Sequence, residues 1–308
     1  MTAPKKILAL FPGQGSQKVG MGKDLYDTHS WAKDIFTRAD QILGFSLSNL
    51  CFNGPLEQLT ATEVVQPAIL TVSTLYFQAF RERLETEAQI VAAAGHSLGE
   101  YSALVAAGAI TFEDAVLLVH KRGKYMQEAV PAGEGKMMAV LGKEISEIEE
   151  ALAGLEGVQI ANINAPGQIV VSGTAAGVNE LKSRMPNAKL IELNVSAPFH
   201  CDLMAPAAAR LNVDLDALEI KLCAFPIFAN VHARAVTEPE DVRQALKDQV
   251  CGRVRWTECM QNAITQTSPD LAVEFGAGNV LGGMLKRINR ELKCCGPDLP
   301  HELERYPS

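Results

Sequence analysis

The first apolar run along the chain covers residues 6–11 and reads as a buried strand. It ends at the turn-rich residues 12–17, Pro-Gly-Gln-Gly-Ser-Gln, whose glycines allow backbone to approach a ligand closely. Apolar residues then recur at helical spacing over residues 31–43 and 66–84. The pattern predicts a strand, a loop that forms one wall of a site, and two helices.

A second short strand is predicted at residues 89–94, and it leads directly into Gly95-His96-Ser97-Leu98-Gly99. Residues 98–107 are rich in alanine and leucine, so a helix should follow. This order of strand, G-x-S-x-G and helix is what a nucleophile elbow requires, and the helix N-terminus favours developing negative charge nearby. Because the bare motif arises by chance in about one protein in ten of this size, its context carries the prediction that Ser97 is catalytic.

After residues 131–135, which are rich in proline and glycine, the rhythm of the pattern changes. Strands are predicted at residues 136–141, 158–164, 168–172 and 189–195, and helices at residues 143–155 and 175–185. The order βαββαβ is the ferredoxin-like pattern. We therefore predict an α/β protein with a hydrolase-like core on a central, mainly parallel sheet, formed by residues 1–130 and 199–308, and an inserted small ferredoxin-like subdomain at 131–198.

Composition narrows the function classes. The 308 residues are 47% hydrophobic and 21% charged, which is ordinary for a globular protein. A net charge of -8 argues against nucleic acid as the main partner, so local cations must meet any anionic substrate. Seven cysteines without a C-x-x-C pair favour a reducing compartment, and Pro12 cuts the N-terminal apolar run far short of a signal peptide or membrane span. We expect a soluble, cytoplasmic protein that binds neither nucleic acid nor membrane.

A serine hydroxyl needs a base to accept its proton, so one of six histidines must reach Ser97. His200 is favoured, because it ends a strand that runs into a proline-containing loop, where a base can be displayed. His96 should project to the opposite side of the elbow, and His120 lies at helical spacing among valine and leucine. The other histidines lack a comparable setting: His29, His232 and His301. On the residues alone, His200 is the favoured base and the alternatives stay open.

Six segments, in order and spanning nearly the whole chain, resemble the malonyl-CoA:acyl carrier protein transacylases. They are Phe11-Pro-Gly-Gln-Gly-Ser-Gln17, Gly95-His-Ser-Leu-Gly-Glu-Tyr101, Lys121-Arg-Gly123, Ala197-Pro-Phe-His200, Val254-Arg-Trp256 and the Val-Leu-x-Gly-x-x-Lys-Arg-Ile run over 280–288. The resemblance implies that a malonyl group passes from coenzyme A to Ser97 and then to the phosphopantetheine thiol of an acyl carrier protein, for fatty-acid or polyketide synthesis. It implies no metal or other cofactor, and nothing in the sequence demands more than a monomer.

The resemblance also assigns roles to residues. Ser97 would be the nucleophile and His200 its base, and the backbone N–H groups of Gln14 and Leu98 would hold the oxyanion. The backbone carbonyl of Arg255 would orient His200, in place of a carboxylate.

Three further residues would shape the substrate site. Arg122 would pair with the malonyl carboxylate through two parallel hydrogen bonds, although its spacing alone favours a solvent-exposed helical arginine. Phe199 would leave little space for an α-methyl substituent, and one methyl is worth only about 1 to 3 kcal/mol of discrimination. Asn164 would line the cleft. Lys286, Arg287 and Arg290 are candidates for a basic patch that binds an acidic carrier protein, although a solvated face of the C-terminal helix explains them equally well.

Two departures from the family pattern are expected to affect loops. In one loop, Arg253 stands where proline is usual and Arg255 where some members have glutamine, which could displace the carbonyl that orients His200. In the other, Ala277 replaces the proline of a Gly-Pro-Gly turn. The main alternative function is a serine esterase or thioesterase, whose elbow would look identical. Such a hydrolase would normally carry an acidic third triad member and would have no reason to keep Arg122 for a carboxylate. A third interpretation, a non-catalytic partner, conflicts with the presence of both Ser97 and His200.

Overall fold

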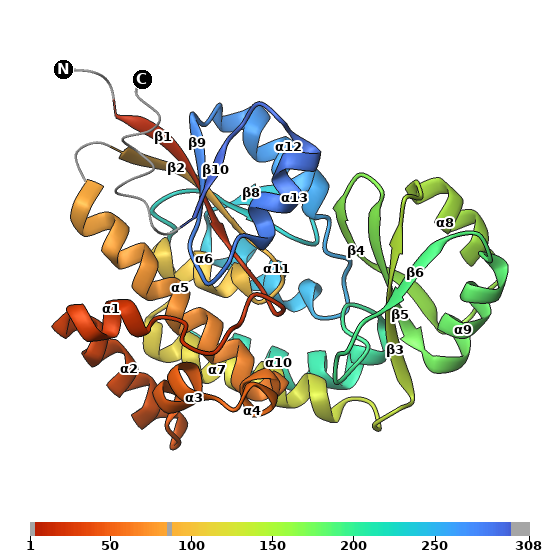
Figure 1. Ribbon diagram of the computed structural model, residues 1–308, viewed down its shortest axis with the longest axis horizontal. Coiled ribbons are helices and arrows are strands. Elements are labelled where there is room, and N and C mark those ends of the chain that lie inside the picture. Colours follow the sequence, from red (N-terminus) through yellow and green to blue (C-terminus); the bar gives the residue numbers. More distant parts are fainter. Residues whose placement is uncertain (1–3, 85–87, 297–308) are drawn as a thin grey trace.

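Two β-sheets organise the molecule, and they stand apart in Figure 1. The computed structural model describes residues 4–84 and 88–296. The larger sheet has the strand order β10-β9-β1-β2-β7-β8. These strands are β1 (Lys5–Phe11), β2 (Ala88–Gly95), β7 (Ile227–Ala229), β8 (Arg234–Val236), β9 (Leu271–Glu274) and β10 (Cys294–Cys295). Every neighbouring pair is parallel except β7 and β8, so the predicted mixed α/β fold with a central, mostly parallel sheet is confirmed.

The continuous apolar run of the sequence forms β1, in the middle of this sheet. Residues 7–11 are fully buried, as expected for a parallel strand that is covered on both faces. Phe11 pairs with Gly95, so β1 and β2 end at the same edge of the sheet. The loop with Gln14 and the G-x-S-x-G turn therefore lie next to each other.

Helices surround the larger sheet, including the two predicted at residues 31–43 and 66–84. They are α1 (Lys23–Thr28), α2 (Ser30–Leu43), α3 (Leu47–Asn53), α4 (Leu56–Thr60), α5 (Thr62–Leu84), α6 (Gly99–Ala106), α7 (Phe112–Glu128), α10 (Ala205–Ala217), α11 (Pro239–Gln249), α12 (Trp256–Thr267) and α13 (Val280–Ile288). None of the helices within the described ranges has both the length and the hydrophobicity that a bilayer span requires.

Helix α5 begins at Thr62 and continues through Pro67, which has no N–H to donate to the carbonyl of Glu63. The side chain of His120 on α7 supplies that bond, with Nδ1 lying 2.8 Å from the Glu63 carbonyl oxygen. His120 therefore stabilises the packing of α5 on α7.

The smaller sheet has the strand order β4-β5-β3-β6, with antiparallel neighbours throughout. Its elements follow the predicted order: β3 (Gly135–Leu141), α8 (Ile145–Leu152), β4 (Val158–Ala165), β5 (Gln168–Thr174), α9 (Ala175–Arg184) and β6 (Lys189–Glu192). Strand β6 is shorter than predicted, because pairing with β3 ends at Glu192. A separate hydrophobic cluster joins this sheet to α8 and α9, which lie on its outer side in Figure 1.

A short parallel bridge joins the smaller sheet to the rest of the protein. The N–H of Val254 donates to the carbonyl of Ala161 at 2.8 Å, and the N–H of Ile163 donates back to the carbonyl of Val254 at 2.9 Å. The Ala161 carbonyl and the Ile163 N–H both belong to β4, which is an edge strand of the smaller sheet. The bridge fixes β4 beside the segment between α11 and α12.

Candidate active site

Ser97 lies on a tight turn between β2 and α6 and has a left-handed backbone conformation, with φ of 51°. A side chain in this region is strained, and such strain is concentrated at functional sites. A Cβ atom at Gly95 would come within 1.9 Å of the Gly99 backbone, and one at Gly99 within 2.0 Å of the Phe11 carbonyl oxygen. Only glycine fits at either position, as the sequence predicted for a nucleophile elbow.

Asn230, a residue that the sequence did not single out, braces this turn from beyond β7. Its Oδ1 accepts the N–H of Ser97 at 2.7 Å, and its Nδ2 donates to the carbonyl of Gly95 at 2.7 Å. The side chain is fully buried. Asn230 therefore holds the strained backbone of the nucleophile on both sides.

The structure brings Ser97 and His200 together, with 2.7 Å between Oγ and Nε2. His200 is 4% exposed, and burial, followed by the positive charge of Arg122, lowers its pKa to about 3. Its Nδ1 lies 3.0 Å from the carbonyl oxygen of Gln249 and 3.2 Å from that of Gly252. Because both partners only accept, Nδ1 carries the proton, and Nε2 is free to accept the proton of Ser97.

The prediction that the Arg255 carbonyl orients His200 is wrong. Arg255 caps the N-terminus of α12, and its carbonyl accepts the N–H of Cys259 within that helix. The carbonyl of Gln249 is available instead because α11 ends there, and the last carbonyls of a helix have no partner within it. The arginine side chain pairs with Glu258, outside the site.

Arg122 points into the protein from α7 and is only 2% exposed, so the solvent-exposed orientation suggested by its spacing is wrong. Nη1 donates to Gln66 Oε1 at 2.8 Å, and Nη2 donates to Gln249 Oε1 at 3.0 Å and to Ser97 Oγ at 3.1 Å. Burial lowers its pKa, yet a guanidinium stays charged in proteins. No carboxylate of the described residues forms an ion pair with Arg122, so its charge can receive an anionic ligand.

These residues line one cavity of about 170 Å³, whose walls come from the turns that follow β1 and β2, from the smaller sheet and from α13. Of the eight predicted site residues, only Arg255 is not among the described residues of the lining. The other seven line the cavity: Gln14, Ser97, Leu98, Arg122, Asn164, Phe199 and His200. Apolar side chains complete the walls: Met126, Met137, Val170, Leu193, Val195, Val280, Leu281 and Met284. A mostly apolar cavity with a few convergent polar groups is typical of a substrate site.

The N–H groups of Gln14 and Leu98 donate to no acceptor within residues 4–84 and 88–296. Leu98 is the N-cap of α6, where the helix dipole also favours negative charge. Their place in the cavity lining supports the expected oxyanion role, which stays a prediction.

His96 is engaged away from the nucleophile. Its Nε2 lies 2.8 Å from Asn164 Oδ1, its ring packs against Trp256 with centroids 5.4 Å apart, and burial lowers its pKa. Asn164 thus lines the cavity and fixes a histidine ring, while His200 alone of the two histidines contacts Ser97 Oγ.

Both departures from the family pattern have defined surroundings in the structure. Arg253 Nε donates to the carbonyl of Ile160 at 3.3 Å, and its guanidinium lies 3.6 Å from Glu149, so the side chain ties its loop to the smaller sheet. In the Gly-Ala-Gly turn, Gly278 takes the positive φ of 93°, and a Cβ at Gly276 would come within 2.4 Å of Pro12.

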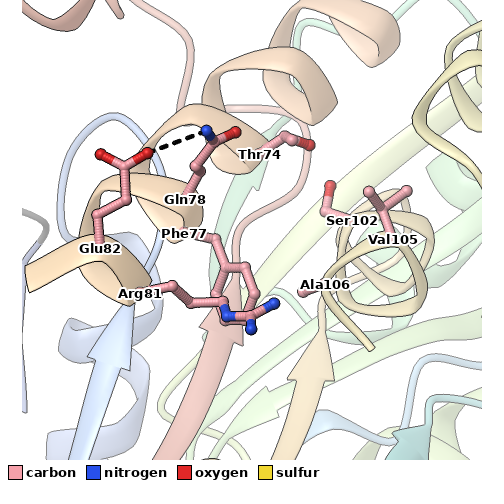
Figure 2. A pocket seen from close by; sticks show the side chains of 8 residues that line it. All are labelled: Thr74, Phe77, Gln78, Arg81, Glu82, Ser102, Val105 and Ala106. Carbon is pink, nitrogen blue, oxygen red and sulfur yellow. Dashed lines mark hydrogen bonds between the residues drawn. The ribbon is translucent and has the colours of Figure 1, made fainter. Parts of the chain in front are cut away.

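A second cavity, of about 360 Å³, lies between α5 and α6 and opens at the surface. Figure 2 shows two of its polar side chains bonded to each other along α5, where Gln78 donates to Glu82 at 3.2 Å. Glu82 also accepts the indole N–H of Trp31 at 3.0 Å. The described residues of its lining include Ser102 but no histidine that could act as a base, so the nucleophilic chemistry belongs to the Ser97 cavity.

Comparisons with known proteins identify the family of this chain. Residues 9–292 match the family model described as the acyl transferase domain. The chain is 46% identical over 306 residues to the malonyl CoA-acyl carrier protein transacylase of Bacillus subtilis, covering 97% of this chain and 95% of that protein. It is 40% identical to the protein of the same name from Haemophilus influenzae, with 94% of each covered.

Solved structures show the same likeness. An acyl carrier protein S-malonyltransferase from Vibrio cholerae superposes with a TM-score of 0.90 at 41% identity, over 95% of this chain and 96% of that one. A malonyl-transacylase solved in complex with its type II PKS acyl-carrier protein also gives 0.90, at 38% identity, over 94% and 95% of the two chains.

Proposed function

The chain belongs to the acyl transferase family, among the malonyl CoA-acyl carrier protein transacylases, and we propose that it moves malonyl groups from malonyl-CoA to the phosphopantetheine thiol of an acyl carrier protein. One observation carries the choice of malonyl: a buried guanidinium without a carboxylate partner among the described residues lies 3.1 Å from the nucleophile. An arginine can bind a carboxylate through two parallel hydrogen bonds. In a malonyl group the carboxylate is two bonds from the thioester carbon.

The reaction has two halves, joined by an acyl-enzyme. In the first, Ser97 Oγ attacks the thioester carbonyl as His200 Nε2 takes its proton, and the N–H groups of Gln14 and Leu98 hold the oxyanion. The C–S bond then breaks, and coenzyme A leaves with the proton from His200. In the second half the carrier thiol gives its proton to His200 and attacks the acyl-enzyme, and Ser97 recovers the proton as it leaves.

The alternative of a serine thioesterase or esterase is not favoured. The carbonyls of Gln249 and Gly252 occupy Nδ1 of His200, where such a hydrolase normally has a carboxylate. Arg122 also gives the cavity a charge that a neutral acyl chain does not need. The first feature argues against a hydrolase, and the second supports an acyl group that carries a carboxylate.

We further propose that residues 131–198 form a ferredoxin-like subdomain inserted in a hydrolase-like core of residues 1–130 and 199–308. The strand order β4-β5-β3-β6 and the separate hydrophobic cluster support this division. A monomeric state and the lack of a metal or cofactor stay predictions. A cytoplasmic location is also a prediction, and the seven cysteines, all free, support it.

The carrier protein is proposed to dock beside α13, whose residues Val280 and Met284 line the cavity. Lys286 and Arg287 are exposed at the end of this helix, and Arg290 is exposed just after it. Arg287 also donates to the carbonyl of Pro166 at 3.2 Å, in the turn between β4 and β5. The cations therefore lie where the larger part of the protein meets the smaller sheet, and an acidic carrier protein is their expected partner.

Intact-protein mass spectrometry after exposure to malonyl-CoA tests the function. The native protein should gain one malonyl group, and labelled malonyl should then pass to the carrier protein and not to water. Ser97→Ala should gain no mass and should lose at least about 10³-fold in turnover. Near-normal transfer by Ser97→Ala, or release of most of the label to water, would remove the assignment.

A further inference from the structure

A carboxylate that the mechanism does not use lies beneath the nucleophile turn. Glu100 is in the first turn of α6 and is only 2% exposed. One oxygen, Oε2, accepts the N–H of Asn230 at 2.9 Å and the side-chain Nε2 of Gln249 at 3.0 Å. A buried carboxylate is costly unless it is hydrogen-bonded, so these two donors are required for it to be ionised there.

Gln249, the second of these donors, also contacts Arg122, Ser97 and His200. Its Oε1 accepts Nη2 of Arg122 at 3.0 Å, its Nε2 also donates to the carbonyl of Ser97 at 3.0 Å, and its backbone carbonyl accepts from His200. The side chain is fully buried. One residue therefore aligns the base and, through its amide, the arginine.

The direction of this amide decides whether Arg122 is held. As it stands, each end of the amide meets a group of the opposite kind. A flip would set the amide N–H groups against Arg122 and the amide oxygen against two acceptors, Glu100 and the carbonyl of Ser97. Oxygen and nitrogen of an amide differ little in shape, so hydrogen-bond partners alone choose between the two directions.

We propose that Glu100 is a positioning residue for malonyl recognition: its Oε2 fixes the Gln249 amide so that the amide oxygen holds Arg122 toward the substrate carboxylate. This rests on the proposed malonyl transfer. Glu100 does not touch the acyl group. Its loss should therefore weaken recognition of a carboxylate more than it slows attack by Ser97, whose contact with His200 depends on backbone carbonyls.

Three substitutions of Glu100 separate the effect of its hydrogen-bond acceptor from the effect of its negative charge. Glu100→Met has similar length and no acceptor, Glu100→Gln keeps an oxygen that can accept both bonds without the charge, and Glu100→Asp keeps the charge but withdraws the oxygen by one methylene. The measurement is the single-turnover acylation of Ser97 by malonyl-CoA and by acetyl-CoA, followed by intact mass over a range of concentrations. The readout is the ratio of kcat/KM for the two substrates.

Glu100→Met is expected to lower the malonyl-to-acetyl ratio about tenfold or more, chiefly through KM for malonyl-CoA, as loss of one bond to a charged group would do. Glu100→Gln should restore the ratio to within about threefold of the native value. Glu100→Asp should fall between the two, and it decides the matter if Glu100→Met does not fold. Asp40→Leu is the control, because Asp40 joins α2 to α3 by accepting from Ser48 and lies outside the cavity lining. It should lower the melting temperature and leave the ratio unchanged.

An unchanged ratio in Glu100→Met, or in Glu100→Asp where the Met variant is unfolded, would overturn the proposal. Equal losses for both substrates would overturn it too, and so would a Glu100→Gln variant that behaves like Glu100→Met. The native protein reports on the proposed function separately. If it is not acylated by malonyl-CoA at all, the malonyl transfer fails; if it is acylated and the ratio does not respond, only the role of Glu100 fails.

Discussion

Replacing Arg122 with alanine removes a buried cation from the cavity of the nucleophile. The guanidinium makes three hydrogen bonds in the free protein, to Gln66, Gln249 and Ser97, at 2.8, 3.0 and 3.1 Å. A bound malonyl carboxylate would compete for the donors that face the cavity. Acetyl-CoA has no carboxylate, so the two substrates should respond differently.

The expected loss of kcat/KM follows from the hydrogen bonds between Arg122 and the malonyl carboxylate. A hydrogen bond to a charged group is worth about 1.5 to 3 kcal/mol. Water can enter the space that Arg122→Ala leaves and can hydrate the carboxylate, so we count one such bond and not two. Since about 1.36 kcal/mol is a factor of ten, kcat/KM for malonyl-CoA should fall by about 10-fold to 150-fold. For acetyl-CoA it should change by less than about fivefold, because removing a nearby positive charge also raises the pKa of His200 and strengthens the base.

Single-turnover acylation, followed by intact mass near neutral pH, measures both substrates on one preparation. Lys121→Ala is the matched control. It removes one positive charge from the same helix, but Lys121 pairs with Asp214 and is absent from the cavity lining. Equal losses for malonyl-CoA and acetyl-CoA in Arg122→Ala would refute carboxylate recognition by this residue, as would a malonyl-specific loss in Lys121→Ala.

Three more predictions concern packing, charge and docking. Gly99→Ala should lower the melting temperature by at least about 6 °C, because the new Cβ would overlap a β1 carbonyl. Gly283→Ala is the control and should be neutral or slightly stabilising, because no described atom lies within 4 Å of the new Cβ. Equal changes in melting temperature for the two variants would contradict the close packing at the turn. Burial raises the pKa of Glu100 to about 7, so the ionised carboxylate lowers the free energy of unfolding above that pH. This loss of stability becomes smaller as the pH falls. Glu100→Gln should therefore raise the melting temperature, relative to the native protein, more at about pH 8.5 than at about pH 5.5, and the opposite order in calorimetry would exclude this sign. Reversing the charges of Lys286 and Arg287 should raise KM for the carrier protein and leave KM for malonyl-CoA unchanged; steady-state kinetics with unaltered carrier KM would exclude the patch.

Local patterns predicted those parts of the fold that depend on local residues. The run ending at Phe11, the G-x-S-x-G turn and the βαββαβ order all follow from neighbouring positions, and the elements were found within a few residues of the expected bounds. Strand β6 ended early because pairing with β3 stops at Glu192, which no pattern within residues 189–195 indicates.

The contacts across the chain could not be predicted in this way. Arg122 faces inward only because α5 and α11 bring Gln66 and Gln249 to it, and those residues lie 56 and 127 positions away. The carbonyl partner of His200 was assigned to Arg255 and proved to be Gln249, because the choice depends on where α11 ends and α12 begins. Asn230 lies in no motif, and Glu100 lies in the Gly95–Tyr101 segment, where the sequence assigned it no role. The available sign for Asn230 was its position, a polar residue directly after a short apolar strand.

The six residues from the end of α11 to Val254 serve two parts of the protein. Gln249 and Gly252 align the imidazole of His200, and Val254 forms the parallel bridge to β4. Cavity width and base alignment are consequently not independent variables. Any tilt of the smaller sheet that widens the cavity for a bulkier acyl group pulls on the backbone that holds the histidine. A larger substrate would thus be disfavoured twice, once by the walls and once by a misaligned base.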